Sequence, residues 1–181
     1  MKQTPSQTVG PYFAYGLTPQ QYNYDFRMFK DGNLVDPLST PDAIAITGRV
    51  LDANGDSIPD AMVELWQNDG ENALFGRYGT GTDPKHRFIF NTIKPKSLDD
   101  NAPFVTAIVF MRGQLIHSYT RIYFPEDSEL HEKDAVLEQI PTERKLTLIA
   151  QKTGENSYVF DIHMQGENET VFFDFLTKSE E

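Results

Sequence analysis

The chain has 181 residues, with 27 acidic against 16 basic side chains, a formal net charge of −11 and no cysteine. This length is enough for one domain with a substantial core, while the acidic balance disfavours a nucleic-acid partner and the lack of cysteine excludes disulfides and thiolate metal sites. No apolar run approaches the roughly 20 residues of a membrane helix, and residues 1–10 lack the charge and apolar block of a signal peptide, so we expect a cytoplasmic protein without a membrane partner.

The first 43 residues differ in composition from the rest of the chain. Residues 4–38 contain four prolines and seven aromatic residues. Prolines at this density prevent a long helix, whereas so many aromatic rings require burial against another surface. The sequence therefore predicts an extended arm over residues 1–43. It leaves two locations open, folded back on its own domain or packed on a partner subunit, and we take the second as the working prediction.

Residues 44–181 have the period-two alternation of β-strands, interrupted by turn-forming residues. Short runs rich in β-branched and aromatic residues predict about eight strands, at residues 44–51, 61–66, 87–93, 104–111, 115–124, 146–151, 158–164 and 170–175. The turns that contain Gly113 and Gly154 are expected to close antiparallel hairpins.

The helical content of this region is expected to be small. Only residues 127–140 have a helical pattern, with Asp127 or Ser128 as the N-cap. We therefore predict an all-β fold, an antiparallel β-sandwich over residues 44–181 with one short helix and the extended arm. Trp66 is expected in its core, and Arg121 in a buried or interfacial ion pair.

The four histidines are the first candidates for metal binding or acid–base chemistry. They are His86, His117, His131 and His163, and no two of them have the His-x-His or i,i+4 spacing that places two imidazoles on one metal. His86 and His131 are expected at the surface, and the two strand histidines are expected to be structural and hydrogen-bonded. No nucleophile elbow, phosphate-binding glycine loop or calcium loop occurs. Composition and spacing thus indicate only an acidic sandwich with an arm.

Three stretches of sequence carry a more specific signal, at residues 4–12, 46–67 and 158–174. Together, and in this order, they resemble the intradiol ring-cleavage dioxygenases over nearly the whole chain, and within that family the iron-free alpha chains of the two-chain members. Residues 46–67 alone are also similar to transthyretin-like and carbohydrate-binding sandwiches. A stand-alone binding module without enzymatic activity therefore stays as the alternative, and a self-sufficient enzyme with unusual ligands as a third hypothesis.

The resemblance implies a reaction and a division of labour between two chains. The expected reaction opens protocatechuate between its hydroxyls with both atoms of O2, giving 3-carboxy-cis,cis-muconate in the β-ketoadipate route of aromatic degradation. The expected cofactor is a ferric ion, held by two tyrosines and two histidines of a partner beta chain. Here the corresponding positions are Leu98, Phe104 and Thr106, and residues 67–76 contain no tyrosine. We therefore expect no metal and no catalytic residue on this chain.

The resemblance also implies substrate-binding residues on this chain. Mapped onto the sequence, they are Thr8, Gly10 and Pro11 in the arm and Arg112 before a glycine turn. A Gly-Pro pair gives a rigid turn without a side chain that would obstruct a planar ring, and an arginine fork suits the substrate carboxylate. The alternatives are plain interface packing for the arm residues and a solvated side chain for the arginine.

Overall fold

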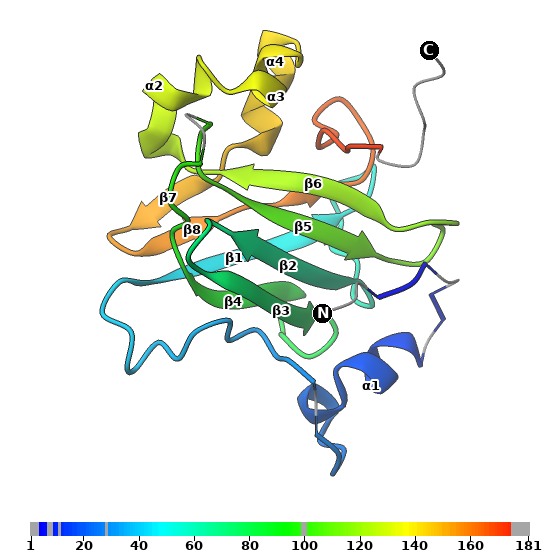
Figure 1. The fold of residues 1–181 in the computed structure, drawn as a ribbon. Helices are drawn as coiled ribbons and strands as arrows, with labels where there is room; N and C mark the ends of the chain where they lie inside the picture. The colour runs from blue at the N-terminus through cyan, green and yellow to red at the C-terminus, as the bar shows by residue number, and fades with distance from the viewer. Residues whose placement is uncertain (1–3, 7–8, 11, 28, 99–100, 175–181) are drawn as a thin grey trace.

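Two β-sheets pack face to face in the computed structural model, which describes residues 4–6, 9–10, 12–27, 29–98 and 101–174. A layer of short helices covers one end of the sandwich, and the N-terminal arm runs along the opposite side (Figure 1). The described residues contain nine strands. The predicted all-β sandwich is therefore confirmed.

The first sheet is built around one long strand, β1. Its members are β1 (Ala43–Leu51), β4 (Arg87–Ile93), β7 (Gln151–Gly154), β8 (Ser157–Val159) and β9 (Ile162–His163), in the order β4-β1-β8-β7 with β9 also paired to β1. Strand β4 pairs with β1 in antiparallel register, but β8 and β9 pair with it in parallel. The prediction of a wholly antiparallel sandwich is wrong for these two pairings.

The break between β8 and β9 explains why one predicted strand, residues 158–164, becomes two. At this break the hydrogen bond to β1 comes from a side chain instead of a backbone group. The Oδ1 of Asp161 accepts the N–H of Arg49 at 2.9 Å, and its Oδ2 pairs with the guanidinium of Arg49 at 2.6 Å. Phe160 passes so close to β1 that its carbonyl oxygen would lie 1.8 Å from a Cβ at position 48. Only glycine fits at Gly48.

The second sheet is antiparallel throughout. Its members, in spatial order, are β3 (Ala73–Gly79), β2 (Met62–Asn68), β5 (Phe104–Phe110) and β6 (Ser118–Tyr123). The hairpins predicted at Gly113 and Gly154 are confirmed as the β5–β6 and β7–β8 connections. Strand β3 was expected to be mostly loop, and the sequence missed it because two glycines and an arginine interrupt the apolar alternation on this edge strand.

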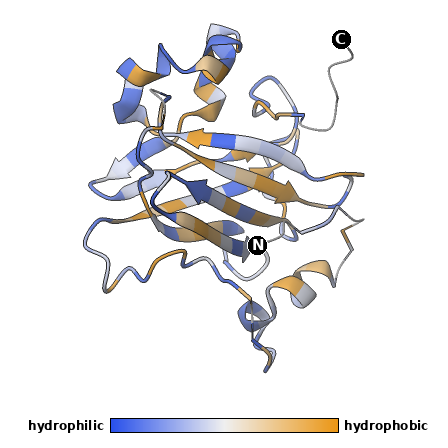
Figure 2. Cartoon of the chain, in the orientation of Figure 1, coloured by the Kyte–Doolittle hydropathy of each residue, from blue (hydrophilic) through white to orange (hydrophobic). Residues whose placement is uncertain are grey.

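The hydrophobic core lies between the inner faces of the two sheets. Burial alternates strictly along β4 and over most of β1, as a period-two pattern requires. Fully buried side chains come from both sheets, including Ile46, Val50, Phe88 and Phe90 from the first and Val63, Leu65, Val105 and Ile122 from the second. Figure 2 shows the resulting alternation of hydrophobic and hydrophilic residues along the strands.

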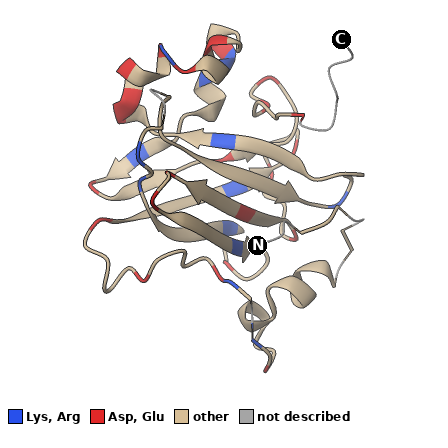
Figure 3. Cartoon of the chain, viewed as in Figure 1, with Lys and Arg blue, Asp and Glu red and all other residues tan. Residues whose placement is uncertain are grey.

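The helical layer differs from the single helix predicted at residues 127–140. It contains five short elements: η2 (Pro125–Asp127), α2 (Ser128–His131), α3 (Ala135–Glu138), α4 (Thr142–Lys145) and η3 (Leu146–Leu148). The buried carboxylate of Asp134 ends the first helical segment and caps the next, because it accepts the N–H groups of Val136 and Leu137. Acidic residues gather on this layer, most clearly on α2 (Figure 3).

Two strands predicted near the C-terminal end are also corrected. Residues 146–148 form η3, so β7 begins at Gln151. Over residues 170–174 the pairing is a single bridge between Tyr119 and Phe173, and residue 175 lies outside the described residues. Both segments are apolar because they pack under the helical layer with Leu137 and Tyr123, and this burial has the same composition as a strand.

The described part of the arm packs on this chain's own sandwich. It contains α1 (Phe13–Leu17) and η1 (Pro19–Tyr22). Within η1, the side chain of Gln21 exchanges hydrogen bonds with the backbone of Gly79 at the end of β3. These bonds cover an edge strand that would otherwise offer unpaired backbone groups. Three aromatic residues farther along, Tyr24, Phe26 and Phe29, remain exposed. Packing of the arm on a partner subunit stays a prediction.

The helices among the described residues are short, and none is long and apolar enough to cross a membrane.

We predict that Gly48→Ala destabilises the chain severely. A methyl group there would meet the carbonyl oxygen of Phe160 at 1.8 Å and the ring of Phe88 at 2.6 Å, and overpacking of this kind costs about 3 kcal/mol or more. Urea unfolding measures the loss. The matched control is Gly154→Ala, whose methyl group would make only ordinary contacts with Ser157. Equal stability of the two variants would contradict the close approach of Phe160 to β1.

Candidate functional site

Arg112 lies at the tip of the β5–β6 hairpin. Gly113 follows it with a φ of +88°, a conformation that favours glycine, and the Gln114 side chain closes the turn by accepting the N–H of Met111 at 3.1 Å. The side chain of Arg112 is 58% exposed, and its Nε pairs with the carboxylate of Asp60. This ion pair involves Nε, and no other hydrogen bond or ion pair of Arg112 occurs among the described residues.

The arm begins its course over the outer face of the second sheet, next to this hairpin. Val9 is buried against Met62, Ile108 and Phe110. Gly10 follows, and its carbonyl accepts the N–H of Phe13 at 3.0 Å, which starts α1. A Cβ at position 10 would meet no atom within 4 Å. No contact among the described residues therefore requires a glycine there.

Two of the predicted substrate-binding residues, Thr8 and Pro11, lie outside the described residues. The predicted roles of both residues stay predictions.

A polar contact joins the arm to the hairpin. The Oγ of Ser6 lies within hydrogen-bond distance of the imidazole Nδ1 of His117 and accepts its backbone N–H at 3.2 Å. The imidazole Nε2 lies 2.8 Å from the hydroxyl of Tyr119, and the ring packs on Phe110. Burial lowers the pKa of His117, against a smaller opposing effect of Glu64. The hydrogen-bonded state predicted for this histidine is confirmed, and its purely structural role stays a prediction.

These contacts bring the arm segment that carries Gly10 to the hairpin that carries Arg112. We call this region the arm–hairpin surface, and it comprises Ser6, Val9, Gly10, Arg112 and His117. Two apolar side chains of the same hairpin, Leu115 and Ile116, are 90% and 53% exposed beside it. The surface thus combines a fixed cation, an open glycine turn and exposed apolar groups.

A buried charged pair underlies the arm, and the sequence reading did not find it. Glu64 is fully buried on the outer face of β2, and the Nε and Nη2 of Arg77 lie 3.0 and 2.8 Å from its Oε1. The Oε2 of Glu64 accepts the indole N–H of Trp66 at 3.2 Å. A signal existed in the sequence, because Glu64 interrupts an otherwise apolar run at residues 61–66, but its partner lies on the strand that was read as a loop.

Two residues singled out in the sequence have different surroundings from those predicted. Trp66 lies half-buried on the outer face of the second sheet, with its ring 4.4 Å from that of Phe75, and not in the core between the sheets. Among the described residues Arg121 forms no ion pair; it stacks over Phe104 at 3.9 Å and donates to the hydroxyl of Tyr123 at 3.1 Å.

The outer face of the second sheet also contains a hollow of about 430 Å³. Its lining is mostly apolar and consists of Trp66, Gln67, Asn68, Ala73, Leu74, Phe75, Phe104 and Thr106. A smaller hollow of about 90 Å³ shares Asn68 and Phe104 with it and is also lined by Leu98. The structure therefore places Phe104 and Thr106 on one hollow and Leu98 with Phe104 on the adjoining one.

The donor set of these hollows does not fit a ferric ion. Hydrocarbon side chains such as those of Phe104 and Leu98 have no donor atom, and the hydroxyl of Thr106 is a weak ligand compared with imidazole or phenolate. Across the described ranges no group of three or more His, Cys, Asp or Glu side chains converges as metal ligands would. The absence of a metal on this chain stays a prediction that chemical analysis must test.

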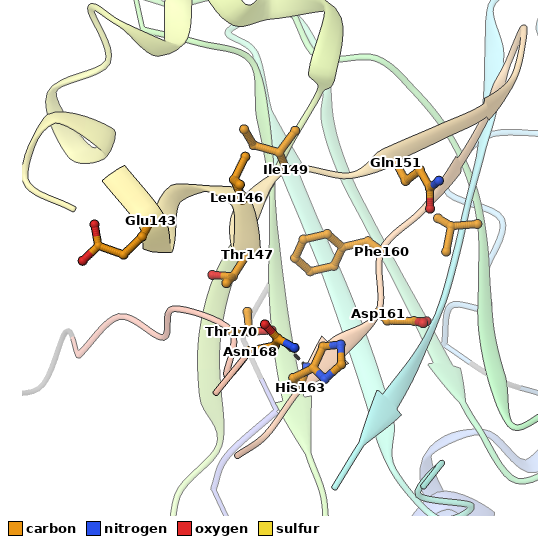
Figure 4. A pocket seen from close by; sticks show the side chains of 11 residues that line it. Glu143, Leu146, Thr147, Ile149, Gln151, Phe160, Asp161, His163, Asn168 and Thr170 are labelled. Carbon is orange, nitrogen blue, oxygen red and sulfur yellow. Dashed lines mark hydrogen bonds between the residues drawn. The ribbon is translucent and has the colours of Figure 1, made fainter. Parts of the chain in front are cut away.

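A third cavity, of about 350 Å³, lies against the first sheet and η3 (Figure 4). Its polar lining includes His163 and Asp161, which lie on the same stretch of chain, and Glu143, which Figure 4 places on a separate segment. The carboxylate of Asp161 is already bound to Arg49, and the backbone N–H of His163 donates to Thr170 Oγ1 at 3.0 Å. The ion pair with Arg49 gives Asp161 a structural role.

Comparison with curated proteins gives near-full-length matches. The chain is 42% identical to the protocatechuate 3,4-dioxygenase alpha chain of Burkholderia cepacia, over 96% of this chain and 98% of the relative. It is 36% identical to the alpha chain of the same enzyme from Pseudomonas putida, over 97% and 98%. The beta chain of the Burkholderia cepacia enzyme matches at 29% identity, over 88% of this chain and 77% of the relative.

Solved structures with this fold are also dioxygenases. The dioxygenase domain of a carbohydrate-binding fusion protein from Streptomyces sp. SirexAA-E superposes with a TM-score of 0.60 at 17% identity, over 91% of this chain and 99% of that domain. Hydroxyquinol 1,2-dioxygenase from Pseudomonas putida DLL-E4 gives 0.57 at 15% identity, over 92% and 68%. At these identities the likeness concerns the fold alone. No protein-family model matches the chain.

We predict that the contact between the arm and His117 weakens on acidification. Because burial lowers the pKa of His117 below its ordinary value of 6.5, the neutral ring stabilises the fold above that pH, and this stabilisation is lost as the pH falls below it. An NMR titration should place the midpoint of His117 below 6.5. The free energy of unfolding should fall between about pH 7.5 and about pH 5.5.

The matched variant is His117→Gln, which cannot titrate and should show a smaller fall over the same range. His131, whose pKa burial also lowers, is present in both proteins, so the difference isolates His117. A midpoint at or above 6.5, or an unchanged fall in the variant, would show that burial does not govern this ring.

Proposed function

The chain belongs to the family of protocatechuate 3,4-dioxygenase alpha chains, within the intradiol ring-cleavage dioxygenases, and from that premise we propose its part in the reaction. With a beta chain it forms an enzyme that opens protocatechuate between its two hydroxyls. Both atoms of O2 enter the product, 3-carboxy-cis,cis-muconate. This chain contributes part of the wall of the substrate pocket at the interface, and the beta chain holds the ferric ion that activates the bound catecholate.

Two observations together carry this proposal. The chain matches alpha chains over nearly its full length, and its side chains at the aligned metal-ligand positions do not fit a ferric ion. The match to alpha chains spans 96% of the chain, so it favours a subunit of the enzyme over a stand-alone binding module that shares only residues 46–67. The residues at the aligned metal-ligand positions, Leu98, Phe104 and Thr106, favour a site on the partner over a self-sufficient enzyme with unusual ligands. The related beta chain supports a partner of the same fold.

The arm–hairpin surface is the part of this chain that we assign to the pocket wall. Gly10 has open space where a side chain would stand, which leaves room for a planar ring against the backbone. Arg112 supplies a permanent positive charge, and its ion pair with Asp60 occupies Nε, so the terminal N–H groups can bind the substrate carboxylate directly or through water. Thr8 and Pro11 are assigned to the same wall.

The proposed location is the cytoplasm, in agreement with a chain that contains no cysteine. Cell fractionation tests this assignment, and recovery of the protein from the periplasm or the culture medium would contradict it.

We predict that Arg112→Ala selectively impairs the charged substrate. In the enzyme assembled with its beta chain, kcat/KM for protocatechuate should fall roughly tenfold, because a charged hydrogen bond is lost. Catechol, which lacks the carboxylate, should be affected much less. The control is Arg87→Ala, which removes a partly exposed arginine paired with the buried Asp83, on a strand of the other sheet, and should spare both substrates. Equal effects of Arg112→Ala on protocatechuate and catechol would remove the proposed carboxylate contact.

We predict a different pattern for Gly10→Ala. Because the added methyl group meets nothing in this chain within 4 Å, the free energy of unfolding should change by less than about 0.5 kcal/mol. In the assembled enzyme the methyl group would intrude on the ring, so kcat/KM should fall roughly tenfold for protocatechuate and catechol alike.

Gly16→Ala is the matched control, since its methyl group also meets nothing within 4 Å and position 16 is not assigned to the wall. Kinetics of Gly10→Ala that equal those of Gly16→Ala would exclude Gly10 from the pocket.

A further inference from the structure

The guanidinium of Arg77 binds the arm at two points, one before Gly10 and one after it. The Nη2 of Arg77 donates to the hydroxyl oxygen of Thr4 at 2.6 Å, and its Nη1 donates to the carbonyl oxygen of Leu17 at 3.4 Å. The hydroxyl of Thr4 in turn donates to Glu64 Oε1, the same oxygen that holds Arg77. The loop that carries the proposed pocket wall thus begins and ends on one buried charged pair.

From this geometry we propose that Arg77, oriented by Glu64, is a positioning residue for the substrate pocket. It touches no substrate, and it acts by fixing where the arm segment that contains Val9 and Gly10 lies on the outer face of the second sheet. The inference rests on the proposed function, because it assumes that this segment forms part of the pocket wall. It adds two residues, on β2 and β3, to those that determine the kinetics of the assembled enzyme.

The burial of the pair supports a role beyond stability. The side chain of Glu64 has no exposed area, and that of Arg77 is only 10% exposed. Removing two charges from water is costly, and hydrophobic residues of similar volume in such places commonly give equal or greater stability. The neighbouring outward positions on β2, Met62 and Trp66, are hydrophobic. A charged pair at this point therefore provides what apolar packing lacks, a directional attachment for the arm.

The apolar contacts of the arm do not by themselves fix its position on the sheet. The ring of Phe13 packs on Phe110 with centroids 5.8 Å apart, and Leu17 joins the same apolar cluster. Contacts of this kind permit sliding, because they have no preferred direction. On the N-terminal side of Gly10 the directional contacts are those of Thr4 and of Ser6 with His117. Arg77 is the residue that links the two sides.

The size of the expected effect follows from the precision that a pocket wall requires. A displacement of about 1 Å at a site of chemistry can reduce the rate roughly 100-fold. Once released by Arg77, the arm would keep its apolar contacts but sample neighbouring positions. We therefore expect the variants described next to lower kcat/KM for protocatechuate by about 10- to 100-fold.

The test is a cycle of Arg77→Met, Glu64→Leu and the double variant, each co-expressed with the beta chain and purified as the assembled enzyme. Each single variant leaves a buried unpaired charge and should be less stable, whereas the double variant should regain the stability of the unmodified protein. In all three variants, kcat/KM should be lower than in the unmodified assembly, and amide hydrogen exchange at Phe13 and Gly16 should be faster than in that assembly. The control is Arg49→Met, which breaks a pair in the other sheet and should leave exchange in the arm unchanged.

The result for the double variant distinguishes a positioning role of the Glu64–Arg77 pair from a merely structural one. If it regains stability, full kcat/KM and normal amide exchange in the arm, the pair is merely structural and the inference is overturned. If the unmodified assembly does not cleave protocatechuate at all, the proposed function fails, and the exchange data alone still show whether Arg77 holds the arm.

Discussion

The outer face of the second sheet is organised by a buried carboxylate that must be neutralised. Glu64 has no access to water, so its charge depends on Arg77, and the guanidinium in turn needs acceptors for its remaining N–H groups. The arm supplies two of them, the hydroxyl of Thr4 and the carbonyl of Leu17. On our account the buried Glu64–Arg77 pair thus determines the course of the arm, which is too rich in proline to form a long helix. Farther along the arm, Gln21 adds a second attachment through its hydrogen bonds with Gly79 at the end of β3.

The two faces of this sheet therefore have different tasks. Its inner face completes the core with the first sheet and makes the domain stable, while its outer face is divided between the arm and the hollow lined by Trp66, Phe75 and Phe104. On our account the chain has the β-sandwich fold but binds no metal. It acts through groups at its surface, namely Gly10, Arg112 and the apolar side chains at the tip of the β5–β6 hairpin.

The sequence predicted the parts of the fold that depend on local patterns. The period-two runs gave β1, β2, β4, β5 and β6, and glycine turns gave two hairpins, because alternation and turn chemistry are properties of neighbouring residues. It missed β3, because two glycines and an arginine interrupt the alternation of that strand, and the division of the helical segment, because Asp134 caps α3 inside the predicted helix. It also missed the parallel pairing of β8 with β1, because that pairing depends on contacts distant in sequence. For the site, motif resemblance gave Gly10 and Arg112, whereas Glu64–Arg77 and Ser6–His117 could be recognised only once the strands were in place. Thr8 and Pro11 lie outside the described residues, so their assignment still rests on the resemblance.

The central claim is that this chain shapes a cavity whose reactive ion belongs to a different polypeptide. The most direct measurement is the iron content and the catechol-cleaving activity of the chain purified alone, compared with the chain co-purified with its beta chain. Our account predicts negligible iron and no ring cleavage for the isolated chain, and about one iron per pair of chains with activity for the complex. Iron bound at about one per isolated chain, together with ring cleavage in the absence of a partner, would contradict it.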